Sequence, residues 1–403
     1  MNIFFIKSIS LLIVFLPLAL ITGPFLPDFF ISLSSLLFLF YSYKNNKWLY
    51  FNNIFFKYFL IFYFYILIRS LFSESTHSIQ SAVFYIRFGV FALVVNFIIN
   101  KDKSFLRNFL LVLFLTFLIL TIDSLIIIFS GQNLLLLNPY NKYRLSSFFY
   151  DNLKLGSFIL RTSPLIIAIY FFLKKDHKFK NNLLINNLFI FFVSVSSFFI
   201  VLYSGERSSF ILLILLSFII ILNMRMDKIN FHIVTVSLFS LLGFILFLIN
   251  TNKILLNRYI KQFANAENFL ENHIDLFHTA YLMFKNNYIF GNGIKSFRFL
   301  CDKEQFIYER IACATHPHNT YLELLSETGI VGFIFVIIPF LFLAYILTKN
   351  IFYRSLKNYN VVLLSILFIN IFPFTTTGSF FGNWLSILYY LPLGFLLNFY
   401  QKK

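Results

Sequence analysis

The stretch His316-Pro317-His318-Asn319-Thr320-Tyr321-Leu322-Glu323-Leu324-Leu325-Ser326-Glu327-Thr328-Gly329-Ile330-Val331-Gly332 lies where a long polar segment meets an apolar run. Thr320 and Glu323 form a Thr-x-x-Glu capping box, which predicts that a helix begins at Tyr321. His318 and Asn319 then precede the positive end of that helix, where a histidine stays neutral, as a general base must. The sequence therefore predicts a reactive centre with His318 as its base, and His316 as a loop neighbour. The alternative is a pair of solvated loop histidines.

The composition around this stretch is that of a membrane protein. The chain has 403 residues, of which 59% are hydrophobic and 12% charged, and its mean hydropathy is +0.80. A soluble domain is about 45–50% apolar and about 25% charged. Apolar runs of roughly 20 residues, long enough to span a bilayer, recur from end to end. We therefore expect an all-α polytopic membrane protein.

Twelve transmembrane helices are expected from these runs, with the first retained rather than cleaved as a signal peptide. They lie near residues 3–22, 25–43, 54–72, 81–99, 105–130, 156–173, 187–203, 208–224, 231–250, 328–348, 361–373 and 383–400. The expected organisation is thus 1–250 with helices 1–9 and an outer loop at 131–155, a large cap at 251–327, and 328–403 with helices 10–12. A loop as long as this cap is too long to be a mere connector. Within the cap, apolar residues from Ile274 to Phe284 have helical spacing, and the turn Gly291-Asn292-Gly293 follows.

The distribution of Lys and Arg sets the expected orientation, because short cytoplasmic loops carry an excess of both. With the N-terminus inside, those loops hold Lys7, Lys44, Lys47, Lys101, Lys103, Arg107, Lys174, Lys175, Lys178, Lys180, Arg225, Lys228, Lys349, Arg354, Lys357, Lys402 and Lys403. The short outer loops hold only Lys142, Arg144, Lys154 and Arg207. Both termini are therefore expected in the cytoplasm and the cap outside. The net charge of +17 follows from this topology and does not indicate nucleic acid.

Four arginines stand toward the outer ends of predicted spans. These are Arg69, Arg87, Arg161 and Arg207. Charge inside a membrane is costly and is retained mainly for function, and guanidinium binds phosphate groups bidentately. We expect an outward-facing basic cavity for a phosphate or diphosphate. The alternative is snorkelling with local pairs, Arg161 with Asp123 and Arg207 with Glu206.

Other chemistries lack their motifs. The sequence has no Gly-rich phosphate loop, no Asp-x-Asp pair and no Gly-x-Ser-x-Gly elbow, so a nucleotide-fuelled reaction is not expected. Two cysteines cannot form a zinc site, and His232, His273 and His278 lack metal-ligand spacing. We expect no cofactor and no metal.

Several motifs together resemble the O-antigen ligase and polymerase superfamily of bacterial inner-membrane glycan transferases. The pattern is His318-Asn319, nine residues, Gly329, two residues and Gly332. Supporting matches are Ser204-Gly205-Glu206-Arg207-Ser208-Ser209, the run from Gly291 to Phe297, and the run from Arg144 to Asn152. The resemblance covers about residues 140–345. Family members commonly open the cap helix with Arg, three residues and an aromatic, where this chain has His273 and Phe277. Its cap arginine would then be Arg258, Arg298 or Arg310.

The resemblance implies a metal-independent, inverting glycosyltransferase at the periplasmic face of the inner membrane. The donor would be a glycan on undecaprenyl diphosphate, and the acceptor a sugar hydroxyl. The acceptor would belong to lipid A-core in a ligase or to the growing glycan in a polymerase, with ligation slightly favoured. His318 would act as the base beside Asn319, and Arg207, Arg161, Arg87, Arg144 and Arg298 would bind the diphosphate.

Two further alternatives stay open from the sequence. Cys301 and Cys313 flank 11 residues of the cap and face the oxidising side of the membrane, where a disulfide is expected in preference to two free thiols. From another functional class, the chain could be a lipid-linked glycan flippase or transporter. Such proteins usually show internal symmetry and no large outer cap, neither of which fits this sequence.

Overall fold

The structure of the chain is a computed structural model, and it is all-helical throughout the residues it describes. These are residues 2–138, 144–174, 183–225, 242–243, 246–256, 259, 266–308 and 311–401. The helices are α1 (Asn2–Val14), α2 (Leu16–Ala19), α3 (Phe25–Lys44), α4 (Ile54–Leu71), α5 (Thr76–Lys101), α6 (Phe105–Ser130), α7 (Leu155–Lys174), α8 (Leu183–Ser204), α9 (Arg207–Asn223), α11 (Lys253–Leu256), α13 (Ala266–Asn286), α14 (Phe297–Leu300), α15 (Thr320–Tyr353), α16 (Asn358–Asn370) and α17 (Asn383–Gln401). Short 3-10 turns lie at η1 (Trp48–Phe51), η2 (Ser147–Phe149) and η4 (Glu304–Phe306).

Seven of the described helices are long and apolar enough to cross a membrane. Three shorter apolar helices lie at Ile3–Val14, Arg207–Asn223 and Asn358–Asn370. Helix α6 has the bounds that its hydropathy predicts, and most of the others differ from prediction by a few residues at each end. The ninth expected span, 231–250, lies mainly outside the described residues. The total of twelve therefore stays a prediction.

The first expected span is broken rather than continuous. Helix α1 ends at Val14 and α2 begins at Leu16, with Pro17 in the first turn of α2. Proline has no N–H to donate and its ring clashes with the carbonyl four residues earlier, so it belongs at the start of a helix and not in its interior. The predicted single helix over 3–22 is thus wrong in this respect.

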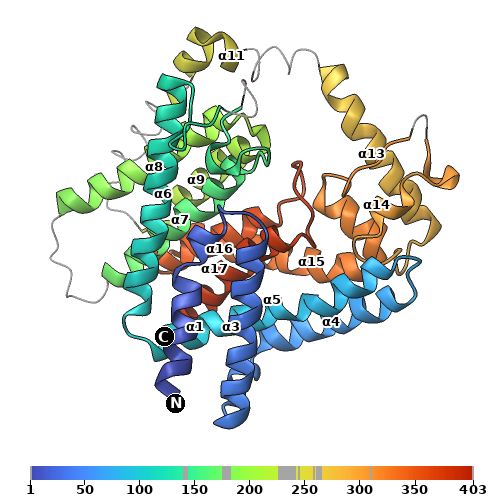
Figure 1. Cartoon of the computed structure of the whole chain (residues 1–403), viewed down its shortest axis with the longest axis horizontal. Coiled ribbons are helices and arrows are strands. Elements are labelled where there is room, and N and C mark those ends of the chain that lie inside the picture. The colour runs from blue at the N-terminus through green and yellow to red at the C-terminus, as the bar shows by residue number, and fades with distance from the viewer. Residues whose placement is uncertain are drawn as a thin grey trace.

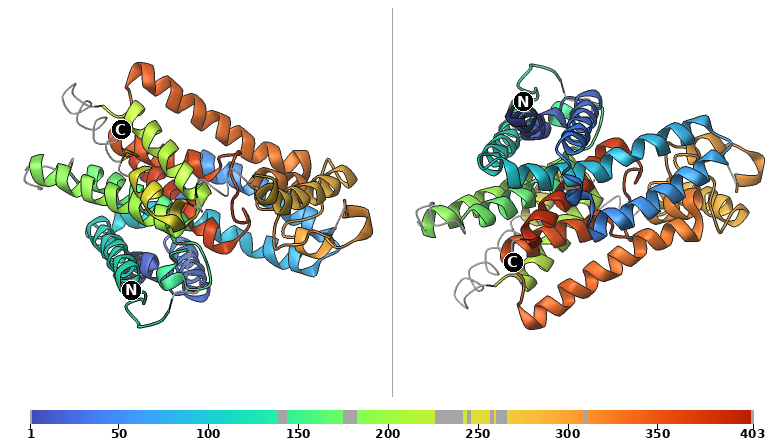
Figure 2. Two further views of the ribbon diagram at one scale, coloured as in Figure 1. Left: turned by 90° about the horizontal axis from the view of Figure 1, so that it is seen from above. Right: turned by 90° about the horizontal axis from the view of Figure 1, so that it is seen from below.

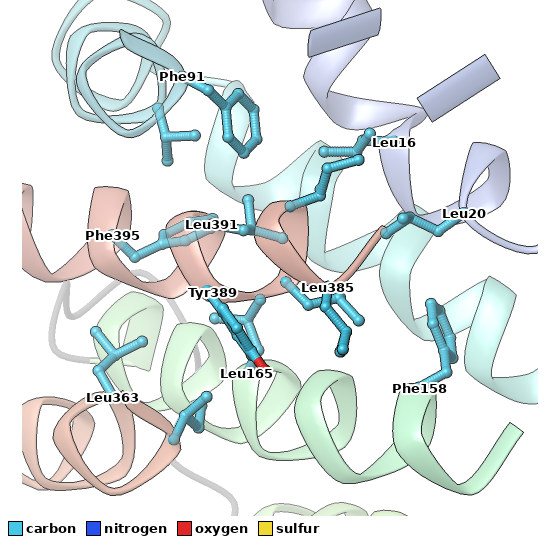
Figure 3. Close-up of a cluster of buried hydrophobic side chains, with 14 of the residues drawn as sticks. Leu16, Leu20, Phe91, Phe158, Leu165, Leu363, Leu385, Tyr389, Leu391 and Phe395 are labelled. Atoms are coloured by element: carbon cyan, nitrogen blue, oxygen red, sulfur yellow. The ribbon is translucent and has the colours of Figure 1, made fainter. Parts of the chain in front are cut away.

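The core lies where α17 packs between α5, α7 and α16 (Figure 3). Leu391 and Phe395 of α17 meet Phe91 of α5, and all three are almost completely buried. Gly394 lets α17 and α5 approach closely, because a Cβ there would lie 2.6 Å from Val95 Cβ and 2.8 Å from the carbonyl oxygen of Ala92. Apolar side chains therefore fix the position of α17, and with it the segment that precedes α17.

The part of the cap from α13 onward gathers at one end of the molecule, around α13 and α14 and beside the turn between α4 and α5, whereas α11 lies apart from it (Figure 1). Its small core includes Met283, Phe297 and Phe306. A disulfide joins Cys301 to Cys313, with their Cα atoms 5.3 Å apart. Figure 2 shows α15 running from the cap along one side of the molecule, with both termini away from the cap.

Helix α15 is interrupted at Gly329, where its backbone forms hydrogen bonds with a segment of the cap. Gly329 has φ 62° and ψ −170°, a backbone conformation that essentially only glycine adopts. The amides of Ile330 and Val331 donate to the carbonyls of Tyr288 and Ile289 at 2.9 and 3.2 Å. In return, the amides at 292 and 293 donate to the carbonyls at 326 and 327. A segment of the cap therefore packs against α15 at Gly329.

Helix α4 completes this joint between the cap and α15. The Tyr65 hydroxyl donates to the carbonyl of Thr328 at 2.5 Å, and Arg69 Nε donates to the carbonyl of Gly291 at 2.7 Å. Gly332 packs against α4, since a Cβ there would lie 3.1 Å from the Tyr65 ring. The cap is therefore hydrogen-bonded to the membrane helices directly behind the His318 segment.

Candidate active site

The His318 segment has an unusual backbone that a neighbouring loop holds in place. His318 has φ 57°, in the left-handed region that non-glycine residues rarely adopt. Its carbonyl accepts a hydrogen bond from the amide of Thr377 at 2.9 Å. Thr377 belongs to residues 373–380 between α16 and α17, here called the threonine loop. A strained backbone of this kind persists where its surroundings fix it, and it is common at functional sites.

Asn319, and not Thr320, is the N-cap of α15. The Asn319 side chain accepts from the amides of Tyr321 at 3.0 Å and Leu322 at 3.1 Å. Its Nδ2 donates to the carbonyl of Pro373 at 3.0 Å. The amide group of Asn319 is thus occupied in joining the start of α15 to the threonine loop.

Glu323 also binds the threonine loop, so the predicted Thr-x-x-Glu capping box is absent. Its carboxylate accepts from the Ser379 hydroxyl at 2.5 Å and from the Phe380 amide at 2.8 Å. Glu327, one turn later, accepts from the amides of Lys295 at 2.6 Å and Phe297 at 3.2 Å. The predicted capping box is wrong because buried backbone amides in the neighbouring loops need hydrogen-bond acceptors, and the two carboxylates accept from these amides instead.

The threonine loop connects α9 to the His318 segment. Thr376 exchanges a hydrogen bond with Ser208, the neighbour of Arg207. The hydroxyls of Thr377 and Thr320 lie 2.8 Å apart. One short loop therefore ties the first turn of α9 to the first turn of α15.

Three histidines meet at this point. The ring of His318 lies 4.3 Å from that of His316 and 5.5 Å from that of His273 on α13, measured between centroids. His316 is buried, and its Nε2 lies 3.1 Å from the carbonyl oxygen of Thr377. Because that oxygen can only accept, Nε2 carries the proton, and Nδ1 accepts from the Thr315 hydroxyl at 2.9 Å. His316 is therefore a structural residue, and burial lowers its pKa to about 4.

His318 is half-buried and suited to accept a proton. Burial lowers its pKa from the ordinary value of 6.5, and His273 lowers it further, against the opposing effect of a backbone hydrogen bond with Thr377. The imidazole is thus neutral at pH 7, as a general base must be. Among the described residues, no three or more His, Cys, Asp or Glu side chains are arranged to hold a metal ion.

Cationic residues lie close enough to His273 and His316 to influence them. Arg207 is the first residue of α9, and its charge lowers the pKa of His273, which burial already lowers. Arg298 and Lys154 both lower the pKa of His316. The N-terminus of a helix adds its own positive end to such a site. The arrangement can hold an anionic group beside a neutral base.

The remaining predicted arginines are engaged elsewhere. Arg87 forms an ion pair with Asp28 at 3.2 Å, and Arg161 donates to the hydroxyl of Ser157 at 2.6 Å. Arg144 Nε donates to the carbonyl of Ser204 at 3.3 Å. Arg69 lies on the cap joint, so three of the four arginines expected in one cavity, Arg69, Arg87 and Arg161, each have a different partner. Arg258 and Arg310 lie outside the described residues.

The acids of the two local ion pairs considered from the sequence accept hydrogen bonds from other described residues. Asp123 accepts from the amide of Leu134 at 2.7 Å and from the hydroxyl of Ser147 at 2.5 Å. Glu206 accepts from the amides of Gly156 at 2.7 Å and Ser157 at 2.9 Å. Both carboxylates therefore stabilise the chain segments whose amides and hydroxyl they bind.

Two parts of the site were missed from the sequence. His273 has no role in the sequence-based prediction, although its place at the expected cap arginine is a usable signal. The run Thr375-Thr376-Thr377 between two apolar segments was not considered at all, and a polar run at that position could have indicated it.

Replacing Asn319 tests how far the threonine loop positions the site. Asn319→Ala removes an N-cap, which costs about 1 kcal/mol, and also the contacts to the loop. We expect a lower melting temperature of the purified protein and weaker activity. Asn319→Asp keeps the acceptor that caps α15, so it should retain more stability than the alanine variant. An alanine variant that matches the wild type in both measurements would contradict this role.

Comparison with known proteins agrees with the geometry. Residues 192–337 match the family model described as O-antigen ligase, and this range contains Arg207, His273, Arg298, His316 and His318. No curated protein matches the chain significantly. The match supports an O-antigen ligase or polymerase type of function and a glycosyltransferase-like enzyme. Together with the apolar helices it indicates a multi-pass inner-membrane protein. Residues 192–337 are therefore similar to the O-antigen ligase family, which supports the resemblance to the O-antigen ligase and polymerase superfamily that the sequence motifs indicate.

Proposed function

We propose that this protein transfers a glycan from undecaprenyl diphosphate to a sugar hydroxyl at the periplasmic face of the inner membrane, most directly to lipid A-core. The observation that supports the proposal is the packing of His318 against His273, which in turn feels the charge of Arg207, inside the region that matches the family model. A neutral base beside fixed positive charge is what attack on a sugar diphosphate requires.

In the proposed reaction, His318 takes the proton of the acceptor hydroxyl. The hydroxyl oxygen forms a bond to the anomeric carbon as the bond from that carbon to the diphosphate oxygen breaks. Arg207 and Arg298 stabilise the negative charge that develops on the departing lipid diphosphate, so no metal is required. Attack opposite the leaving group inverts the anomeric centre. The energy comes from the sugar–diphosphate bond, so no nucleotide is consumed.

The remaining predicted residues are proposed to position the base or to bind the donor more weakly than Arg207. Asn319 is assigned to positioning His318, because both ends of its amide group are already bound. Arg87, Arg144 and Arg161 would lie farther along the donor and contribute less than Arg207. The cap is proposed to be periplasmic, with both termini in the cytoplasm.

Deleting the gene and separating the surface lipopolysaccharide on a gel tests the proposed function. Loss of all long chains, with undecaprenyl-linked polymer accumulating, is the result expected for a ligase. Core carrying a single repeat unit would instead identify a polymerase. Unchanged surface glycans would rule out both activities, and donor trapped on the cytoplasmic side would indicate a flippase.

The pH dependence of transfer follows from the lowered pKa of His318. A general base works only when it is deprotonated, so activity is expected to be constant above neutral pH. It should fall as the pH drops through a value below the ordinary 6.5 of histidine. Initial rates of the purified protein across pH 5–8, at saturating donor, check this. A midpoint clearly above 6.5 would contradict the assignment.

A further inference from the structure

Four exposed leucines form the tip of a compact turn after α6. The turn is Asn133-Leu134-Leu135-Leu136-Leu137, here called the leucine turn. The exposed fractions of its leucines are 45, 63, 77 and 49% in chain order, whereas Asn133 is 6% exposed. Contiguous exposed apolar surface of this kind marks a site of interaction with a partner or a membrane.

The backbone of the leucine turn has no amide left without an acceptor. The amides of Leu135 and Leu137 both donate to Asn133 Oδ1 at 2.9 Å. Asn133 donates to the carbonyl of Leu137 at 3.0 Å, and Leu136 donates to the carbonyl of Asn133 at 2.9 Å. The remaining amide, that of Leu134, donates to Asp123 Oδ1 at 2.7 Å. In a loop surrounded by water, free backbone amides can donate to the solvent. In a segment that contacts lipid, each amide needs an acceptor within the protein, because lipid offers no hydrogen-bonding partner.

The turn also folds back along α6 instead of extending away from it. Asp123 is completely buried and lies seven residues before Ser130, where α6 ends. At 1.5 Å per residue, this contact lies roughly 10 Å back from the end of the helix. The leucines therefore lie beside the last two turns of a candidate membrane span.

Helix α6, beside which these leucines lie, has an exposed apolar face of its own. Leu111, Leu115, Ile119, Ile122, Leu125 and Phe129 recur at helical spacing and are each at least 36% exposed. On a helix that is long and apolar enough to span a membrane, such a face contacts lipid. The leucine turn lies beside the last two turns of this same helix, held there by the contact of Leu134 with Asp123.

We propose that the leucine turn inserts into the bilayer beside the C-terminal end of α6 and that its ligand is the acyl chains of membrane lipids. The hydrogen-bonded backbone amides, the backward fold along α6 and the exposed leucines beside a helix with a lipid-facing side all indicate lipid as the occupant. Asp123 binds the hydroxyl of Ser147 as well. The same carboxylate therefore fixes the depth of the returning segment, which carries Arg144.

Fluorescence quenching at a single introduced cysteine tests this proposal. The native cysteines form the Cys301–Cys313 disulfide and do not react. Leu136→Cys, Leu115→Cys on the lipid-facing side of α6 and Asn152→Cys in the exposed outer loop are each labelled with a small fluorophore. The full-length proteins are placed in vesicles of phosphatidylethanolamine and phosphatidylglycerol, with or without lipids carrying a nitroxide near the start of the acyl chain.

The label at Leu136 is expected to behave like the label at Leu115. Nitroxide lipid should quench it several-fold more than it quenches the label at Asn152, while aqueous iodide should quench it weakly. Strong quenching by iodide, as at Asn152, would overturn the proposal. Protection from both quenchers would overturn it as well, because a protein surface would then cover the turn.

A second variant tests whether the turn's own hydrogen bonds hold it in the membrane. Asn133→Ala leaves the amides of Leu135 and Leu137 without their acceptor, so quenching at Leu136 by nitroxide lipid should fall and quenching by iodide should rise. The matched control is Gln132→Ala, an exposed neighbour outside the turn, which should change neither. An unchanged depth in the Asn133→Ala protein, with Leu115 as the internal reference for folding, would overturn this part of the proposal.

Discussion

Replacing His318 with alanine is expected to abolish glycan transfer while leaving membrane insertion and folding intact. The imidazole is the neutral base beside the cationic residues of the site, and loss of a general base typically lowers turnover by about 10²- to 10⁴-fold. The measurement is the transfer rate of the purified variant at saturating donor and acceptor, together with its amount in the membrane.

His278 provides the matched control for this substitution. It is a cap histidine on the same helix as His273, and its ring stacks on Tyr308 at 4.2 Å. His278→Ala should keep most of the activity. Near-normal transfer by the His318→Ala protein would remove His318 from the mechanism.

Replacing Arg207 with lysine is expected to impair transfer severely although the charge is kept. Guanidinium can form two parallel hydrogen bonds to a phosphate group, whereas lysine offers a single charged point. Losing one fixed donor to a developing negative charge costs on the order of 10²-fold in turnover. We therefore expect a loss of about that size in the kcat of Arg207→Lys, measured with lipid-diphosphate donor.

Arg107→Lys is the control for the exchange of arginine for lysine. Arg107 is an exposed residue near the start of α6, far along that helix from Asp123, and its replacement should leave kcat unchanged. An Arg207→Lys protein with wild-type kcat would show that charge alone is sufficient there. Bidentate binding by Arg207 would then be wrong.

Hydropathy predicted most of the helices because their length and apolar character depend on local sequence. Helix α6 is the clearest case, with both ends where they were expected. The break at Gly329 was not predictable in the same way. It depends on carbonyls of residues 288 and 289, some 40 positions earlier, accepting hydrogen bonds from α15.

The candidate site was predicted in part, because its central residue lies in a local motif and its surroundings do not. His318 and Arg207 were named from motif and position. His273 joins them only because α13 packs against α15, which sequence spacing does not reveal.

The acidic residues show why pairing by charge was a poor guide. Asp123, Glu206, Glu323 and Glu327 each accept hydrogen bonds from backbone amides. Helix starts and buried turns leave amides without acceptors, and a carboxylate nearby satisfies them. Two opposite charges close together in the sequence suggest an ion pair. The sequence does not show that nearby backbone amides compete for the same carboxylate.

The most direct test of the account is a transfer reaction with purified components. The protein is mixed with a glycan on undecaprenyl diphosphate and a lipid A-core acceptor, in the presence of EDTA and without nucleotide, and the product linkage is determined by NMR. We expect transfer with an inverted anomeric centre, release of undecaprenyl diphosphate, and no product from the His318→Ala protein. Product with retained configuration, or transfer that proceeds equally well without His318, would contradict it.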